Sequence, residues 1–277
     1  MGETTSIVGR TAVVTGGARG LGRSMVRALL VAGASVLAVD RDAEAEAMDL
    51  DDLGDRYQFL RVDLTADDAP GAVLAACLER FGRVDMLVNN AGTGHAEDEA
   101  WHADSLKRFD ETSYLDMFRI HALAPFRLMR TFVPIMREQG SGRVVTVTTS
   151  LTTMLRPTGM GAPYGAVKAA SEALMSIVAR ELEGSGVTFN VLVPGGPVDT
   201  TMMADASGGV RARLLKPEVM GPPVCWLASD DANGETAKRI VASQWSAGDS
   251  IEASKALAIA PIGWSMEHAP VAGGARG

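Results

Sequence analysis

The chain has 277 residues, 47% of them hydrophobic and 22% charged, which is enough to bury a large core. Its net charge is −8 and it lacks a run of lysine or arginine, so we expect no nucleic-acid partner. No apolar run approaches the ~18 residues that span a bilayer, so we expect no membrane partner. The N-terminus has no basic segment followed by an apolar one, so we expect no signal peptide. Cys77 and Cys225 lie far apart without metal-ligand spacing, which predicts two buried thiols, no metal site and a cytoplasmic location.

Apolar strand-like segments alternate with helical patterns along the chain. Continuous apolar strands separated by helices indicate an α/β fold with a parallel sheet that helices cover on both faces. We predict one doubly wound domain over residues 1–277, with a core of about 8–245 and a C-terminal extension, partly flexible, at 246–277. The predicted strands are 11–15, 35–39, 58–62, 86–90, 143–149 and 188–194, with helical spacing between them, as in 21–33 and 111–137.

The first predicted strand runs directly into a glycine-rich turn, TGGARGLG, that opens the first helix. Its glycines, Gly16, Gly20 and Gly22, allow a tight turn and let the backbone approach a pyrophosphate, which a helix N-terminus attracts. The position of this turn between the first strand and the first helix predicts a dinucleotide site. The alternative is a glycine-rich turn that binds no ligand.

Asp40 closes the second predicted strand, about 20 residues after the glycines. A carboxylate there can accept hydrogen bonds from the adenosine ribose and would repel a 2′-phosphate, which favours NAD. Arg19 and Arg41 favour NADP, because a guanidinium nearby could hold that phosphate. We give the carboxylate more weight and predict NAD, with NADP as the alternative.

The glycine spacing G-x-x-x-G-x-G resembles that of the short-chain dehydrogenase/reductase family, in its shorter single-domain form. Three later motifs agree with this resemblance: RVDLT (61–65) after the third strand, NNAG (89–92) after the fourth and PGGPVDT (194–200) after the sixth. The resemblance covers about residues 8 to 245 and implies a Rossmann-type fold with NAD(P) across the carboxyl ends of the strands.

The resemblance also implies which residues contact the cofactor. The motif after the third strand would contact adenine, NNAG would support the cofactor, and the motif after the sixth strand would hold the nicotinamide amide. The implied set is Gly16, Arg19, Gly20, Leu21, Gly22, Asp40, Arg41, Asp63, Leu64, Asn90, Ala91, Gly92, Tyr164, Lys168, Pro194, Gly195, Val198 and Thr200.

Tyr164 and Lys168 lie one helical turn apart in APYGAVKAA, so both side chains project from the same helix face. A free phenol, with a pKa near ~10, is a poor base at pH 7. A neighbouring ammonium, helped by the positive nicotinamide of the oxidised cofactor, would lower that pKa. The pair matches the family's Y-x-x-x-K, which implies that Tyr164 exchanges the proton and that Lys168 also holds the nicotinamide ribose. The alternative is a solvated surface pair.

The family also uses a hydroxyl at the end of the fifth strand to orient the substrate oxygen. Counting from Gly142 places this hydroxyl on Thr149, whereas the next residue, Ser150, has the preferred residue type. Because successive strand residues face opposite sides of a sheet, we expect only one of the two to serve. Sequence leaves the choice between them open.

A departure from the family lies in the fourth helix, where family members usually have an asparagine that helps to route protons through water. The matching residue here is His121. An imidazole can donate and accept, and could relay a proton with a pKa near ~6.5. A buried structural histidine is the alternative reading.

A second departure lies near the C-terminus. The segment 235–245 keeps a strand pattern but lacks the family's glycine pair, and we expect 246–267 to pack over the sheet edge, the active site or a partner subunit. Apolar residues on more than one face of 111–137 and 164–183 predict a homodimer or homotetramer.

Together these features predict an NAD(P)-dependent oxidoreductase that interconverts an alcohol and a ketone in a small-molecule substrate. The 3-oxoacyl carrier reductases are the nearest general resemblance. A dinucleotide-binding sensor or scaffold without turnover is the alternative. We favour the enzyme because the chain keeps both Tyr164 and Lys168.

Overall fold

A computed structural model describes residues 7–42, 51–94, 105–156, 160–203, 211–246 and 250–264. The strands are β1 (Thr11–Thr15), β2 (Ser35–Asp40), β3 (Tyr57–Arg61), β4 (Met86–Asn89), β5 (Gly142–Val147), β6 (Val187–Val193), β7 (Lys238–Val241) and β8 (Ile259–Pro261). The α-helices are α1 (Gly20–Val31), α2 (Ala69–Phe81), α3 (Ser105–Arg108), α4 (Glu111–Phe118), α5 (Ala124–Glu138), α6 (Leu151–Leu155), α7 (Gly161–Glu181), α9 (Gly221–Ala228) and α10 (Ile251–Ala258). Short 3₁₀ turns are η2 (Asp51–Arg56), η4 (Thr201–Met203), η5 (Pro217–Met220), η6 (Asp230–Ala232) and η7 (Ala242–Gln244), and η3 (Arg119–Leu123) is a π-helical turn.

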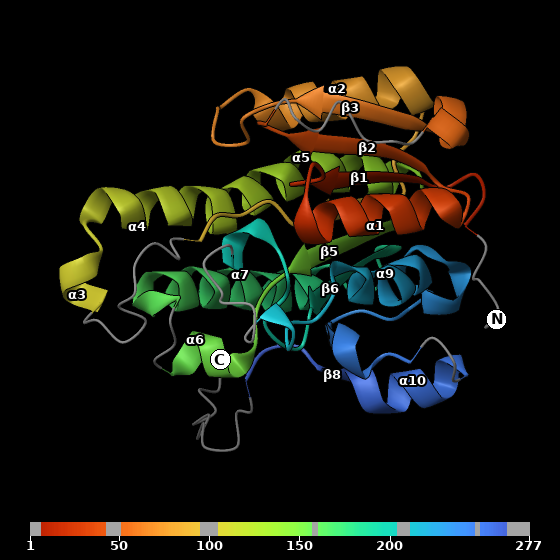
Figure 1. Cartoon of the computed structure of the whole chain (residues 1–277). Helices are drawn as coiled ribbons and strands as arrows, with labels where there is room; N and C mark the ends of the chain where they lie inside the picture. Colours follow the sequence, from red (N-terminus) through yellow and green to blue (C-terminus); the bar gives the residue numbers. More distant parts are fainter. Residues whose placement is uncertain are drawn as a thin grey trace, which may run out of the picture.

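All eight strands form one sheet in the order β3-β2-β1-β4-β5-β6-β7-β8, with helices on both faces (Figure 1). Every neighbouring pair is parallel except β7 with β8. The chain direction across the sheet reverses between β3 and β4, so β1 and β4 lie side by side in the middle. In open α/β sheets, ligands bind outside the carboxyl ends of the strands at such a switch point.

The central strands β1, β4, β5 and β6 are buried on both faces, as their continuous apolar runs predicted, whereas the edge strands β3 and β8 are only partly buried. Along β1, Ala12 and Val14 pack into a core with α1 and α9, whereas Val13 packs on the opposite face with α2, α5 and α7. This alternation follows from the two-residue period of a strand. The predicted Rossmann-type doubly wound α/β sheet is confirmed.

The described part of the C-terminal extension packs at one edge of the sheet, one of the three locations expected for it. Ser250 caps α10 by accepting a hydrogen bond from the Ala253 amide at 3.2 Å. The following strand, β8, pairs antiparallel with β7, with Ile259 opposite Ile240. The sequence pattern did not predict this eighth strand, because three residues are too few for a periodic signal.

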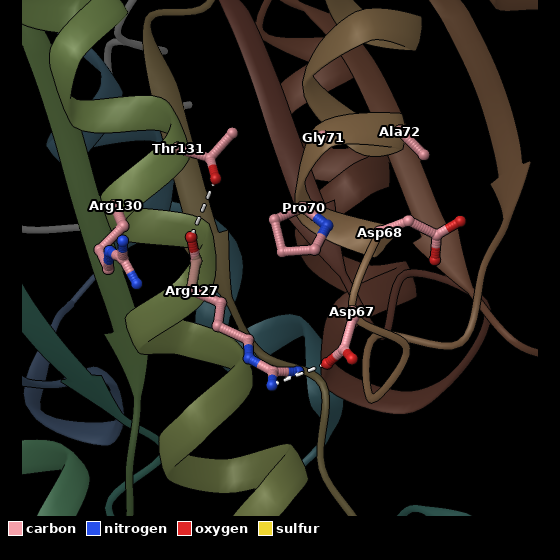
Figure 2. Close-up of a pocket in the computed structure, with 8 residues that line it drawn as sticks. All are labelled: Asp67, Asp68, Pro70, Gly71, Ala72, Arg127, Arg130 and Thr131. Atoms are coloured by element: carbon pink, nitrogen blue, oxygen red, sulfur yellow. Dashed lines mark hydrogen bonds and ion pairs between the residues drawn. The ribbon is translucent and has the colours of Figure 1, made fainter.

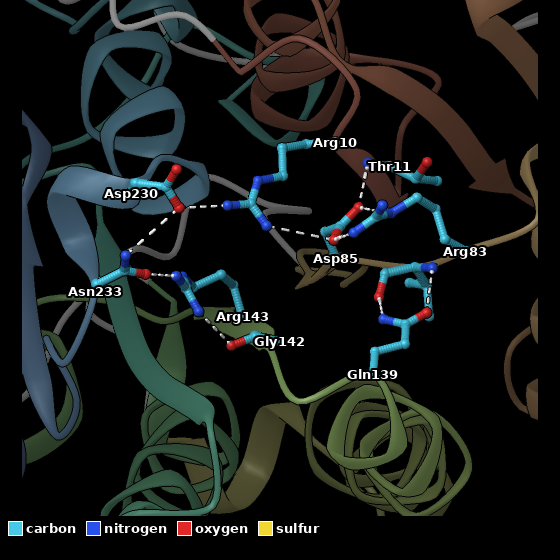
Figure 3. Close-up of polar contacts among 10 residues, drawn as sticks. Arg10, Thr11, Arg83, Asp85, Gln139, Gly142, Arg143, Asp230 and Asn233 are labelled. Carbon is cyan, nitrogen blue, oxygen red and sulfur yellow. Dashed lines mark hydrogen bonds and ion pairs between the residues drawn. The ribbon is translucent and has the colours of Figure 1, made fainter.

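At the amino ends of the central strands, a buried polar cluster joins β1, β4 and the segment before β5 (Figure 3). Asp85, only 4% exposed, accepts hydrogen bonds from the Thr11 amide at 2.8 Å and from Arg83 at 2.6 and 2.8 Å. Arg10 pairs with both Asp85 and Asp230, so it links this cluster to η6. A buried carboxylate requires such partners, because burial removes its hydration.

We predict that Asp85→Ala lowers the free energy of unfolding by roughly 2–3 kcal/mol, because a buried amide and two arginines lose their acceptor. Urea unfolding followed by circular dichroism measures the change. Asp55→Ala is the matched control, since the Asp55–Arg80 ion pair is exposed and should contribute little. Equal stabilities for the two variants would contradict the role given to Asp85.

Candidate active site

The glycine turn between β1 and α1 is closely packed. Gly16 and Gly20 have φ values of +63° and +53°, in the left-handed region that glycine readily adopts. A Cβ on Gly22 would lie 1.8 Å from the Gly16 carbonyl oxygen, so no side chain fits there. No described side chain caps α1 at Arg19, which leaves the amides of its first turn for an anion. The turn therefore fits a pyrophosphate.

The NNAG motif braces this turn. The Asn90 side-chain amide donates to the carbonyl oxygens of Thr15 and Gly16 at 2.9 and 3.1 Å. The Thr15 hydroxyl accepts from the amides of Asn90 and Ala91 at 2.9 and 3.1 Å. Sequence reasoning missed Thr15, although a polar residue at the end of a buried strand is a usable signal.

Asp40 lies at the end of β2 and contacts the same turn. Its carboxylate accepts hydrogen bonds from the amides of Ala18 at 3.1 Å, Arg41 at 2.8 Å and Asp42 at 3.2 Å. Arg19, one of the two arginines expected to favour NADP, pairs with Asp42 at 3.2 Å. Asp42 was not considered in the sequence, because its side chain reaches Arg19 only through the fold.

The residues after β3 have different environments. The Asp63 carboxylate accepts from the Thr65 amide at 2.9 Å and from its hydroxyl at 2.8 Å, and these hydrogen bonds lower the pKa of Asp63. The Leu64 side chain is buried in the core on the α2 face of the sheet. Any contact of Leu64 with a cofactor would therefore come from its backbone.

The segment after β6 reaches the glycine turn from the other side. Gly195 has φ +93°, and a Cβ there would lie 2.0 Å from the Ser243 hydroxyl oxygen. Pro194 accepts a hydrogen bond from the Ser243 amide at 2.9 Å, and Val198 is buried nearby. The methyl group of Thr200 lies 3.1 Å from the Cβ position of Gly20, so the two predicted cofactor motifs are in contact.

Tyr164 and Lys168 lie in the first two turns of α7, and only 8% and 6% of them are exposed. The Lys168 ammonium donates a hydrogen bond to the Val147 carbonyl at the end of β5, at 2.9 Å. It also lies 5.8 Å from the centre of the Tyr164 ring. A solvated surface pair is therefore excluded, since both side chains are buried against the carboxyl end of the sheet.

Burial acts on the two groups in opposite directions. It raises the pKa of Tyr164 to about 12 and lowers the pKa of Lys168 to about 8, because each charged form loses hydration. In the chain by itself, Lys168 does not lower the tyrosine pKa as the sequence analysis expected. A lowered Tyr164 pKa remains a prediction for the enzyme that has the positively charged nicotinamide bound beside the phenol.

The two candidate hydroxyls differ in their local roles. Ser150 is the N-cap of α6: its side chain accepts from the Thr153 amide at 3.0 Å and contacts the Thr153 hydroxyl at 2.9 Å. The Thr149 hydroxyl makes no hydrogen bond to any residue that the structure describes, while its backbone carbonyl accepts from Arg239. Both hydroxyls lie directly after the strand that Lys168 contacts.

His121 lies in the π-helical turn η3 between α4 and α5, where the sequence predicted one continuous helix. Its ring is buried edge-on against Tyr164, with centroids 5.5 Å apart. Nε2 lies 2.7 Å from the Thr93 carbonyl and 3.2 Å from the Thr93 amide, whereas Nδ1 is buried and has no partner among the described residues. Burial and the nearby Lys168 hold the pKa of His121 well below 6.5, so the ring is neutral at pH 7. A Cβ on Gly92 would overlap this ring, at 2.3 Å from Cε1.

A separate hollow lies between the N-terminus of α2 and α5 (Figure 2). Arg127 pairs with Asp67 across it at 2.8 Å, and Arg130 and Thr131 lie on the α5 side. Neither Tyr164 nor the glycine turn lines this hollow, so it is not part of the candidate site.

Both cysteines are unpaired, Cys77 buried as expected and Cys225 only partly buried, and burial raises the pKa of both thiols to about 12. Such thiols are unreactive. Over the described ranges, His, Cys, Asp and Glu side chains form no group suited to a metal ion. Within the parts of the chain that the structure describes, no helix has the length and apolar character that a bilayer crossing requires.

Comparison with known proteins gives consistent matches. A family model described as short chain dehydrogenase matches residues 10–209. Fluoren-9-ol dehydrogenase of Terrabacter sp. (strain DBF63) is 34% identical over 259 residues, which cover 86% of this chain and 72% of that protein. The 3-ketoacyl-(acyl-carrier-protein) reductase of Brucella melitensis, solved with NADH, is 26% identical with a TM-score of 0.71, over 82% of this chain and 93% of that one. The Pseudomonas aeruginosa RhlG/NADP active-site complex is 28% identical with a TM-score of 0.74, and the match covers 87% of this chain and 97% of that one.

The region matched by the family model contains the glycine turn, the NNAG motif and the buried Tyr164–Lys168 pair. These matches confirm the resemblance seen in the sequence and the predicted use of a nicotinamide cofactor. They also favour the enzyme over a non-catalytic sensor, because the similar proteins are dehydrogenases and reductases. The chain belongs to the short-chain dehydrogenase/reductase family and is an NAD(P)-dependent oxidoreductase that interconverts alcohols and ketones.

Proposed function

We propose that the enzyme uses Tyr164 to move a proton to or from the oxygen of the substrate during alcohol–ketone interconversion. The observation that carries this proposal is the buried Tyr164–Lys168 pair at the carboxyl end of β5. The bound nicotinamide supplies the hydride chemistry. The protein positions the oxygen and excludes water, which strengthens the interaction of the phenol with nearby positive charge.

Each remaining group has a role in this proposal. Lys168, held by the Val147 carbonyl, contributes positive charge beside the phenol and would hold the nicotinamide ribose. Thr149 orients the substrate oxygen, since its hydroxyl is not used within the described structure, whereas Ser150 caps α6. The cofactor-contacting role of the glycine turn, NNAG and residues 194–200 is supported by their contact with one another.

Tyr164→Phe should lower kcat at least about 100-fold, because the proton donor is lost, while the NADH dissociation constant changes less than about twofold. NADH absorbance with a panel of ketones measures turnover, and NADH fluorescence measures binding. Tyr114→Phe is the control, since Tyr114 is an exposed residue of α4 that also loses only a hydroxyl. Turnover that survives Tyr164→Phe would remove the mechanism.

We also propose that His121 relays protons to the site as a neutral imidazole. We place the ring proton on Nε2, because the 2.7 Å contact with the Thr93 carbonyl is shorter than the 3.2 Å contact with the Thr93 amide. The buried Nδ1 is then free to accept from a water beside Lys168. This assignment gives a role to Nδ1, the ring nitrogen that lacks a partner among the described residues. A histidine with a purely structural role would not need an unpartnered buried nitrogen.

His121→Leu should lower kcat about tenfold, because the relay is lost, whereas His121→Asn, which can still donate and accept, should stay within about threefold of wild type. Steady-state kinetics from pH 6 to pH 9 measure both variants. Equal kcat values for the leucine and asparagine variants would show that the residue only fills space.

For the cofactor, we propose a preference for NAD over NADP. The Asp40 carboxylate lies at the glycine turn where the adenosine ribose is expected, and a negative charge there repels a 2′-phosphate. Asp42 pairs with Arg19, so one of the two arginines that could attract the phosphate already has an acidic partner. Arg41 is exposed as well, and it forms no ion pair with the residues that the structure describes.

Asp40→Ser should raise the ratio of kcat/KM for NADPH over NADH at least about tenfold, because the repulsive charge is removed. Parallel assays with the two reduced cofactors measure this ratio. Asp116→Asn, an exposed change on α4, is the control and should leave the ratio unchanged. A wild-type enzyme that prefers NADPH would contradict the assignment.

Beyond the site, we propose that the whole chain acts as one domain in the cytoplasm and assembles into a homodimer or homotetramer. The unpaired cysteines support a reducing compartment. Assembly is supported by large apolar side chains exposed on α4, α5 and α7, which are Tyr114, Leu115, Phe118, Phe126 and Ile177.

A further inference from the structure

Three consecutive residues at the end of β5 are each held by a side chain from a neighbouring element. The Val147 carbonyl accepts from Lys168, as described above. The Thr148 hydroxyl donates to the Glu172 carboxylate at 2.9 Å. The Thr149 carbonyl accepts from Arg239. Each of the three residues that lead to the proposed substrate-orienting hydroxyl is therefore held by a side chain from another element.

Glu172 is the centre of this arrangement. It lies on α7 one turn after Lys168 and two turns after Tyr164, so it shares their helix face. Its side chain is fully buried and pairs with Arg239 of β7, which is only 7% exposed. The same carboxylate oxygen accepts from Thr148 and from Arg239.

The C-terminal extension covers the pair. Arg239 lies opposite Ala260 of the antiparallel strand β8. The Gly263 amide, two residues after β8, contacts the second oxygen of Glu172 at 3.4 Å. Gly263 has φ +89°, a left-handed conformation that suits glycine and allows the chain to turn there.

We propose that the buried Glu172–Arg239 ion pair is a positioning device for the reaction: it holds residues 148 and 149 so that the Thr149 hydroxyl faces the substrate oxygen. This inference rests on the proposed role of Thr149. It also gives the extension a function, because β8 pairs with the strand that carries Arg239 and the Gly263 amide contacts Glu172.

A purely stabilising role explains the pair poorly. Removing two charges from water is costly, and apolar residues of similar size often stabilise a core equally well. What apolar residues cannot do is bind the Thr148 hydroxyl and the Thr149 carbonyl at fixed positions. A small displacement of a positioned group lowers the rate steeply, so geometry here matters more for kcat than for folding.

The same strand offers a matched control at its other end. Arg143, at the amino end of β5, is also buried and also donates to a neighbouring backbone carbonyl, that of Gly142, and to Asn233 (Figure 3). It lies at the opposite end of β5 from Thr148. Loss of Arg143 should therefore affect stability without affecting the site.

The test compares Thr148→Val, Thr148→Ser, Glu172→Gln and Arg143→Met in the full chain. We expect Thr148→Val and Glu172→Gln to lower kcat about tenfold, with the NADH dissociation constant within about twofold of wild type. Thr148→Ser keeps the hydroxyl and should retain kcat within about twofold. Arg143→Met should lower the thermal midpoint but keep kcat.

Unchanged kcat in Thr148→Val, measured beside an inactive Tyr164→Phe, would overturn this inference and leave the proposed function standing. Equal losses of kcat in Arg143→Met and Thr148→Val would also overturn it, since the effect would then be general loosening of β5. Full turnover by Tyr164→Phe would overturn both the proposed function and the inference. Thr148→Val decides the question if Glu172→Gln does not fold, because valine keeps the branched β-carbon of threonine and loses the hydrogen bond to Glu172.

Discussion

The parallel pairing of β1 with β4 is the constraint on which the site depends. Because the strand order reverses there, the turn after β1 and the motif after β4 end beside each other without a helix between them. Thr15 and Asn90 use this closeness to join the two segments by four hydrogen bonds, two accepted by the Thr15 hydroxyl and two donated by the Asn90 side chain. These hydrogen bonds fix the glycine turn against the NNAG motif. A segment that is already fixed in this way loses less conformational entropy when a ligand binds.

Burial defines the chemistry of the other half of the site. Tyr164 and Lys168 each have a pKa displaced toward the neutral form, because the sheet and α7 exclude water from both. A neutral phenol suits proton donation to a forming alkoxide. A phenolate suits the reverse direction, and it requires positive charge that the chain supplies only in part, through Lys168. The neutral His121 beside them adds no competing charge.

The two ends of β5 show how buried polar groups can serve different purposes in one strand. At the amino end, Arg143 binds the Gly142 carbonyl and Asn233, the residue that follows η6. This end of β5 is opposite the end of the sheet where the glycine turn lies. At the carboxyl end, three side chains bind residues 147, 148 and 149, which include the hydroxyl that we propose orients the substrate. These side chains are Lys168, Glu172 and Arg239. The C-terminal extension adds to the second set only. Its packing at the sheet edge therefore connects a peripheral segment with the site through one buried carboxylate.

The sequence by itself determined the strand–helix alternation, the glycine turn and the Tyr164–Lys168 pair. These depend on local periodicity and on spacing within a few residues, which a single chain displays directly. Tertiary structure alone decided that Arg19 has an acidic partner, that His121 sits in a π-helical turn against the tyrosine, and that Glu172 meets Arg239 from another element. Such contacts join residues that the linear pattern keeps far apart, and whether a charge is buried or paired depends on neighbours that only the folded sheet brings together.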